Sequence, residues 1–100
     1  MFDAFSSKTS AVLPDGPAAA AQLLEPALAA VAGPGAEPVS LTLDYAASAR
    51  AGAVVTVEAG LDRATRTLAF AYARLVDMEG SVIATGAAVF RRVTEITKAA

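Results

Sequence analysis

Alanine is the residue that most constrains how this chain can fold, because 26 of its 100 residues are alanine. The larger apolar residues (Leu, Ile, Val, Phe, Met and Tyr) number only 29, so a chain of this length has a modest core. An alanine side chain buries little area, but it lets neighbouring elements approach each other closely. We therefore predict a single domain over residues 1–100, built from thin, closely spaced layers, with a second chain supplying part of the burial.

The residue types that the chain lacks exclude several chemistries. It contains no cysteine and no histidine, which excludes a thiol nucleophile, a histidine base, a Ser-His-Asp triad, a disulfide and a zinc finger. The net charge is −2 and the basic residues are scattered, which argues against nucleic acid as a partner. The most apolar stretch, residues 17–32, is shorter than the ~20 residues of a membrane span. We expect a soluble, cytoplasmic protein with no membrane partner, no metal and no cofactor.

Residues 17–32 are predicted to form the helix of the domain. Alanine and leucine, the strongest helix formers, dominate this segment, and proline is tolerated at Pro17 because its missing N–H has no intrahelical partner there. Residues 33–35 (Gly-Pro-Gly) end the helix, and Pro26 is expected to kink it or to divide it into two short pieces. Apolar residues recur at helical spacing on one stripe: Ala20, Leu23, Leu24, Ala27, Leu28 and Val31.

Four strands are predicted after the helix, because the apolar period changes there from 3.6 to 2. They cover residues 39–45, 55–62, 67–74 and 82–93, and short polar loops make the last three a continuous antiparallel meander. One face of the strand 67–74 carries large side chains, while the other carries only alanines. An alanine-rich helix can lie closely against the alanine face. The expected fold class is therefore α+β. Residues 1–14 show no firm periodicity, and a short strand and a helical turn both remain open.

Short motifs follow one another in order between Val39 and Val93. They are Thr42 in the first strand, the turns Ala49-Arg50-Ala51-Gly52 and Asp77-Met78-Glu79-Gly80, and the last strand from Ala84-Thr85 to Phe90. In this order they resemble the hot-dog fold acyl-CoA thioesterase superfamily, in particular the phenylacetate-degradation thioesterases. The resemblance covers a little over half of the chain. It implies a curved antiparallel sheet, over about residues 38–93, wrapped around one long central helix at about residues 17–32.

The resemblance also implies where a catalytic site would lie. Family members open the central helix with His-Gly-Gly and place an Asp or Glu about two turns into it. Here Asp15-Gly16-Pro17 opens the helix, and Glu25 is the acidic candidate. Backbone N–H groups at a helix start can polarise a thioester carbonyl, and a carboxylate can attack it or activate water. On this hypothesis Gly16 supplies an N–H, Glu25 is the base or nucleophile, and Gln22, on the same side of the helix, orients substrate or water.

Each of these polar residues also has a simpler interpretation. Asp15 is a candidate for substrate binding at the helix mouth, although an Asp at this place is more often a helix cap. Arg91 and Arg92 are candidates for contact with the phosphates of a CoA-like ligand, although charges at the end of a last strand are usually just exposed. The three catalytic candidates fit a plain helix start with a solvated edge. Asp44 and Glu58 are explained as polar residues on an outward face of the sheet, and Glu58 is given no role.

The functional prediction is hydrolysis of an acyl-CoA-like small molecule by carboxylate and backbone chemistry alone. One helix cannot cover both faces of the sheet, and the family forms its sites between protomers, so we expect a homodimer or homotetramer. The alternative is a non-catalytic hot-dog module that binds acyl or acyl-CoA ligands or mediates oligomer assembly. A helix–sheet domain of another fold is the third and weakest alternative.

Overall fold

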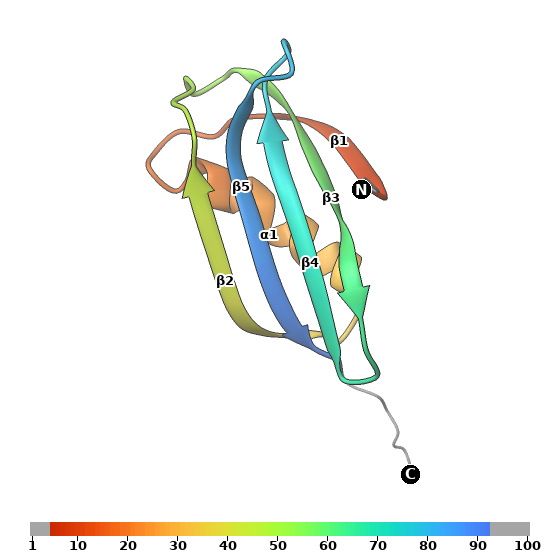
Figure 1. Ribbon diagram of the computed structural model, residues 1–100. Helices are drawn as coiled ribbons and strands as arrows, with labels where there is room; N and C mark the ends of the chain where they lie inside the picture. The colour runs from red at the N-terminus through yellow and green to blue at the C-terminus, as the bar shows by residue number, and fades with distance from the viewer. Residues whose placement is uncertain (1–4, 93–100) are drawn as a thin grey trace.

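One antiparallel sheet of five strands and one helix make up the structure, a computed structural model that describes residues 5–92 (Figure 1). The elements in chain order are β1 (Ser7–Val12), α1 (Ala19–Ala32), β2 (Glu37–Tyr45), β3 (Val54–Ala64), β4 (Leu68–Val76) and β5 (Val82–Arg91). The strand order in the sheet is β1-β3-β4-β5-β2, and α1 crosses one face of the curved sheet. This is the arrangement of the predicted hot-dog fold.

The three strands β3, β4 and β5 form the antiparallel meander that the short polar loops predict. The two outer strands come from distant parts of the chain: β1 pairs with β3, and β2 pairs with β5. For the N-terminal segment a strand and a helical turn were both expected alternatives. The structure contains the strand, over residues 7–12. Val93, the predicted end of the last strand, lies outside the described residues.

Helix α1 lies within the predicted range, at Ala19–Ala32, and it is one continuous helix although Pro26 stands inside it. Its N-cap residue is Ala18, which makes no side-chain hydrogen bond, so the interpretation of Asp15 as the cap is wrong. At the other end, Gly33 adopts a φ of 104°, and its N–H donates to the Ala29 carbonyl at 3.1 Å. Glycine tolerates this positive φ without strain, which explains why the helix stops there.

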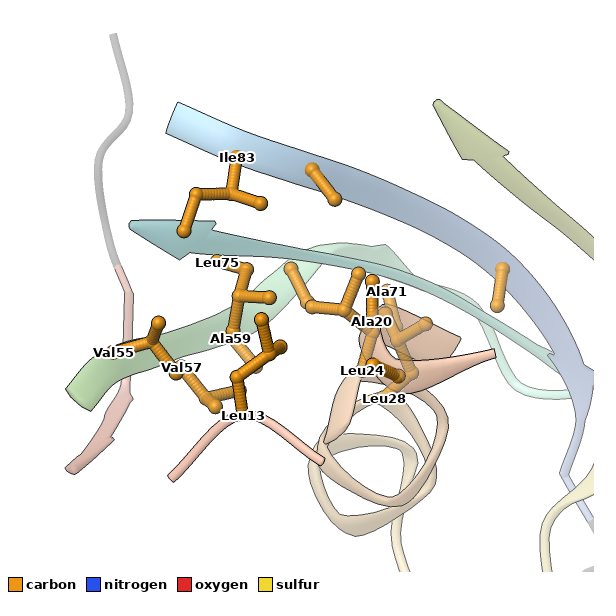
Figure 2. Packing of buried hydrophobic residues seen from close by; sticks show 14 of the residues in the cluster. Leu13, Ala20, Leu24, Leu28, Val55, Val57, Ala59, Ala71, Leu75 and Ile83 are labelled. Carbon is orange, nitrogen blue, oxygen red and sulfur yellow. The ribbon is translucent and has the colours of Figure 1, made fainter. Parts of the chain in front are cut away.

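The helix lies over rows of small residues in the middle of the sheet. In one row across β3, β4 and β5, Ala59 pairs with Ala73 and Ala73 pairs with Gly86. Facing them, Leu24 and Leu28 of α1 are completely buried (Figure 2). The predicted alanine face of β4, namely Ala69, Ala71 and Ala73, is buried as well. The expectation that alanine brings the helix close to the sheet is therefore confirmed.

Gly86 is the residue on which this close approach depends most directly. A Cβ atom at this position would lie 3.1 Å from Leu43 Cδ2 and 3.3 Å from Leu28 Cδ1. The Leu28 side chain is fully buried and has no room to move away. A side chain with γ-carbons at position 86 would therefore push α1 off the sheet.

We predict that Gly86→Val lowers the free energy of unfolding by about 1–3 kcal/mol, because it overpacks the contact with Leu28. Ala87→Val is the matched control, since Ala87 is the next residue of β5 and is exposed on the other face. Urea unfolding of both variants at one protein concentration measures the difference. A Gly86→Val variant as stable as the control would contradict the role given to Gly86.

The outer face of the sheet, away from α1, carries a buried carboxylate. Lys8, Glu58 and Arg74 are direct neighbours across β1, β3 and β4. Arg74 Nε donates to Glu58 Oε1 at 2.5 Å, and Lys8 Nζ lies 3.5 Å from Glu58 Oε2. The Phe5 ring covers Arg74, with the guanidinium carbon 4.6 Å from the ring centroid. Glu58 therefore faces outward, as predicted, although these partners leave it only 6% exposed.

The ion pair also sets the titration of Glu58. The hydrogen bond from Arg74 lowers the pKa of this carboxyl below its ordinary 4.5, and the charges of Arg74 and Lys8 add to this effect. Burial acts in the opposite direction and raises the pKa, but it does not reverse the net shift. A carboxyl whose pKa is lower in the folded state stabilises that state above its unfolded pKa. This contribution disappears as the pH falls through the folded pKa.

We predict that Glu58→Gln lowers the free energy of unfolding at pH 7 by about 1–2 kcal/mol, because it removes a hydrogen bond between charged groups. The wild type should lose stability more steeply than this variant as the pH falls below about 4.5. Urea unfolding between neutral and acidic pH measures both effects. Glu37→Gln, which removes the exposed pair of Glu37 with Arg91, is the control and should cost less than ~0.5 kcal/mol. Equal pH profiles for wild type and Glu58→Gln would contradict the assignment.

Candidate functional site

Two hollows lie between α1 and the β2 side of the sheet, and they contain the two main catalytic candidates separately. The first, here called the N-terminal hollow, has a volume of about 160 Å³ and includes Gly16. The second, here called the Glu25 pocket, has a volume of about 260 Å³. Tyr45, the last residue of β2, lines the first hollow, while Pro38 and Leu41 in the first half of β2 line the second.

The N-terminal hollow is built around the start of α1. Besides Gly16, Pro17, Ala19 and Ala20, the loop after β2 supplies Ala47, Ser48 and Ala49. Two backbone hydrogen bonds hold this loop near the helix: Gly52 N–H donates to the Leu13 carbonyl, and Leu13 N–H donates to the Ala53 carbonyl, each at 2.9 Å. The turn Ala49-Arg50-Ala51-Gly52 therefore helps to form the hollow, and Gly52 takes the positive φ of 90° that the turn requires.

Backbone N–H groups are available at this helix start. The Ala19 N–H donates to the Gly16 carbonyl at 3.2 Å, and the Gln22 N–H donates to the Ala18 carbonyl at 2.9 Å. Within residues 5–92, no acceptor is found for the N–H groups of Ala20 and Ala21. Unpaired donors together with the positive end of the helix dipole favour a carbonyl oxygen that gains negative charge.

The Glu25 pocket has an apolar interior and a carboxylate at its rim. Its floor consists of the buried side chains of Leu28, Ala88 and Phe90. Glu25 itself is exposed, so its carboxylate lies where the pocket opens. The remaining lining residues are Ala29, Ala36, Pro38, Ser40 and Leu41. This arrangement suits an apolar group whose reactive end stays near the carboxylate.

Gln22 does not line the pocket of Glu25. It lines a third hollow of about 320 Å³, on the opposite flank of α1 beside β1, together with Leu23, Pro26 and Ala30. We call this hollow the β1 groove; its strand side consists of Ser7, Thr9, Ala11 and Val57. The helix separates this groove from the Glu25 pocket.

The three substrate-binding candidates also lie apart from one another. Asp15 is exposed in the turn before α1, next to Gly16 but outside the residues that line the N-terminal hollow. Arg91 pairs with Glu37 at the end of β5, with Nη1 3.3 Å from Oε1. Arg92 donates from Nη1 to the Thr65 carbonyl at 3.0 Å, on the β3–β4 side. Of the two arginines, only Arg91 therefore lies beside the first half of β2.

One protomer does not bring Gly16 and Glu25 together. Glu25 lies six positions after Ala19, where α1 begins, which is about 9 Å along a helix axis. Sequence reasoning also missed the apolar pocket itself. Its walls come from α1, the following loop, β2 and β5, and only the Gly-Pro-Gly turn at residues 33–35 hinted that the chain doubles back there.

Within residues 5–92 no group of three or more acidic side chains is placed to hold a metal ion. The same residues include no helix whose length and apolar character would carry it across a bilayer.

Comparison with solved structures reveals the same fold in proteins of low sequence identity. The phenylacetic acid degradation protein PaaI of Thermus thermophilus, solved as a point mutant, superposes with a TM-score of 0.75 at 19% identity. The match covers 86% of this chain and 84% of that one. Thioesterase superfamily member 2 of zebra fish gives a TM-score of 0.70 at 20% identity, over 90% of this chain and 78% of that chain.

A third similar structure contains a ligand. A protein of Streptococcus mutans bound to acetyl CoA has a TM-score of 0.74 at 9% identity, with 88% of this chain and 81% of that chain covered. No family model matches the chain, and no curated protein matches it in sequence. The structural likenesses confirm the predicted hot-dog fold, which these structures share.

Proposed function

We propose that this chain, which has the hot-dog fold of thioesterase-superfamily proteins, hydrolyses acyl-CoA-type thioesters at a site shared by two protomers. The observation that carries the proposal is the position of the two hollows along β2. The N-terminal hollow lies at the Tyr45 end, and the Glu25 pocket lies at the Pro38 end. Tyr45 lies seven positions after Pro38, or about 24 Å along an extended strand.

Antiparallel pairing of β2 with a second copy of itself would bring the two hollows together. The two-fold axis of such a pair runs normal to the sheet, midway between the two β2 strands and level with their middle, so it reverses the strand direction and keeps both helices on one face. The helix start of one protomer then lies opposite the Glu25 pocket of the other. Each dimer would contain two complete sites, and Arg91 would lie at the same seam.

The exposed edge of the sheet supports this pairing. β2 is an edge strand, and its backbone offers unpaired N–H and C=O groups to another strand. It also presents Val39, Leu41 and Tyr45 to solvent, with exposed fractions of 54%, 39% and 58%. Helix α1 packs mainly on β3, β4 and β5, so Leu41 and Tyr45 on the inner face of β2 stay exposed and can be covered by another chain.

Thioester hydrolysis needs donors that polarise the substrate carbonyl and a group that attacks it or activates water, and this chain supplies both. The free N–H groups at the start of α1 would hold the thioester oxygen and stabilise its negative charge. Glu25 of the facing protomer would remove a proton from water, or attack the carbonyl itself. The C–S bond then breaks, the thiol leaves with a proton, and the acid product carries the oxygen of water. Neither step requires a metal or a cofactor.

One observation favours the alternative, a module that binds an acyl-CoA-like ligand without hydrolysing it. Gln22 lies in the β1 groove, so within its own protomer Glu25 has no neighbouring amide to orient water. A binding module would need the apolar Glu25 pocket but not the carboxylate. The two functions therefore differ in their dependence on Glu25.

We predict that Glu25→Gln lowers kcat/KM for acyl-CoA hydrolysis by about 10²–10⁴-fold, because a general base contributes about that much. Release of free CoA, followed with a thiol reagent, measures the rate. Glu79→Gln removes an exposed carboxylate from the β4–β5 turn and should leave the rate unchanged. Full activity of Glu25→Gln would remove Glu25 from the mechanism, while ligand binding without any turnover in the wild type would support the binding module.

We also predict a dimer, or a tetramer built from such dimers, whose dissociation constant rises at least tenfold in Val39→Lys. Each β2 would then place a charged lysine in the seam, against apolar residues of the partner strand. The matched control is Val12→Lys, because Val12 is 60% exposed on β1 at the other edge of the sheet. Light scattering after size exclusion, over a range of concentrations, gives the assembly state. A fully active wild-type monomer would contradict the shared site.

A further inference from the structure

We propose that the Tyr45 hydroxyl is a catalytic donor, which hydrogen-bonds the thioester oxygen beside the start of α1 in a site whose Glu25 belongs to the other protomer. The inference rests on the proposed function for the choice of a thioester and for the pairing of two β2 strands. It goes further in giving the thioester oxygen a side-chain donor in addition to the backbone N–H groups of the helix.

The end of β2 holds Tyr45 at the N-terminal hollow, on the helix side of the sheet. Tyr45 pairs with Ala84 of β5, so the two side chains lie on the same face. Ala84 is completely buried and shares its face of β5 with Gly86, which lies against α1. The next two N–H groups after Tyr45 both donate to the Ile83 carbonyl, at 2.9 and 3.1 Å, which fixes the chain there.

The Tyr45 hydroxyl is available to a ligand. The residue is 58% exposed although it lies on the inner face, and within residues 5–92 its hydroxyl makes no hydrogen bond. Of the ten residues that line the N-terminal hollow, only Tyr45 and Ser48 carry a polar side chain. The tyrosine side chain is the longer one and starts from a strand instead of a loop, so it is the better placed donor.

A phenol beside unpaired N–H groups completes a site for a negatively charged oxygen. Ala20, whose N–H has no acceptor within residues 5–92, lines the same hollow, so both donors face one space. As the attacking oxygen bonds to the carbonyl carbon, an electron pair of the C=O bond moves onto the oxygen that these donors hold. The pair returns when the C–S bond breaks, and Tyr45 keeps its own proton throughout.

Glu25 can act on the same thioester only from the other protomer. Within one chain, Tyr45 stands at one end of β2 and the Glu25 pocket lies at the other, beside Pro38. Antiparallel pairing of two β2 strands places Tyr45 of one protomer opposite the Glu25 pocket of its partner. The oxygen donors and the carboxylate of each site therefore come from different copies of the chain.

The first experiment measures the hydrolysis of a panel of acyl-CoAs by Tyr45→Phe, which keeps the ring at the β2 seam. Loss of one donor to the oxygen should lower kcat by about 10²-fold, while KM changes by less than about threefold. Light scattering should give the same dimer as for the wild type.

Two controls accompany this variant. Tyr72→Phe alters the only other tyrosine, which pairs with the exposed Ala87 on the outer face of the sheet, and Ser48→Ala removes the other polar group of the hollow. Both should leave kcat unchanged. An unaltered kcat in Tyr45→Phe, or an equal loss in either control, would overturn the assignment.

The second experiment uses mixed dimers to test which protomer supplies each group. A dimer of one Tyr45→Phe protomer and one Glu25→Gln protomer would contain one site with both substitutions and one site with neither. Two different affinity tags on co-expressed chains isolate this dimer, and its activity should be about half that of the wild type. If the two groups of one protomer acted together, both sites would be defective. Activity as low as that of the parent variants would therefore overturn the proposal.

The third experiment separates this proposal from the failure of the enzymatic function. S-(2-oxopentyl)-CoA has a carbonyl that the protein cannot hydrolyse, and S-pentyl-CoA lacks only its oxygen. In calorimetry on the full chain, Tyr45→Phe should weaken the first ligand about three- to tenfold, the effect of one hydrogen bond, and the second less than about twofold.

This difference in a wild type that hydrolyses no thioester would support the Tyr45 contact and reject hydrolysis. Equal effects on the two ligands would overturn the contact even in an active enzyme. A wild type that neither binds these ligands nor hydrolyses any acyl-CoA would overturn both proposals.

Discussion

The contact between α1 and the alanine and glycine rows of the sheet is the constraint on which the rest of the structure depends. Leu24 and Leu28 reach the middle of the sheet because Ala73 and Gly86 leave room for them. This contact fixes how far the helix stands from the sheet and therefore where its two flanks lie. The Glu25 pocket and the β1 groove are the spaces that remain on either side of it.

The small size of the core also connects the fold to the proposed assembly. Helix α1 covers the middle strands, and the inner face of β2 continues past it with large apolar residues. In the proposed dimer the same strand that completes the burial also completes the chemistry, because its two ends carry the two halves of the site. Stability and activity would then share one surface, and neither would be available to an isolated protomer.

The helix and the last four strands could be predicted from the sequence because their periodicities are local. The 3.6-residue stripe in residues 19–32 and the alternation along β4 need no distant partner to be recognised. The first strand could not be predicted, because Ser7, Lys8 and Thr9 show no apolar alternation and become a strand only through pairing with β3. The burial of Glu58 was hidden for the same reason, since it results from partners on two other strands.

The candidate site, like the fold, could be predicted from the sequence only in part. Glu25 and the helix start could be named from motifs within the chain, whereas the pocket that gives Glu25 its surroundings is formed by four separate segments. Gln22 illustrates the limit of helical spacing. Residues three apart differ by about 60° around a helix axis. Here that angle is enough to place Gln22 and Glu25 on opposite flanks of α1, where each lines a different hollow.

The alanine face has a thermodynamic consequence as well as a geometric one. Burying an alanine freezes no side-chain rotamers, whereas each buried leucine loses roughly 0.5–1 kcal/mol in rotamer entropy. The layer between α1 and β4 therefore becomes ordered with little loss of side-chain freedom, which partly offsets the small area that each alanine buries. A short chain that is poor in large apolar residues can in this way keep a single, well-defined helix–sheet contact.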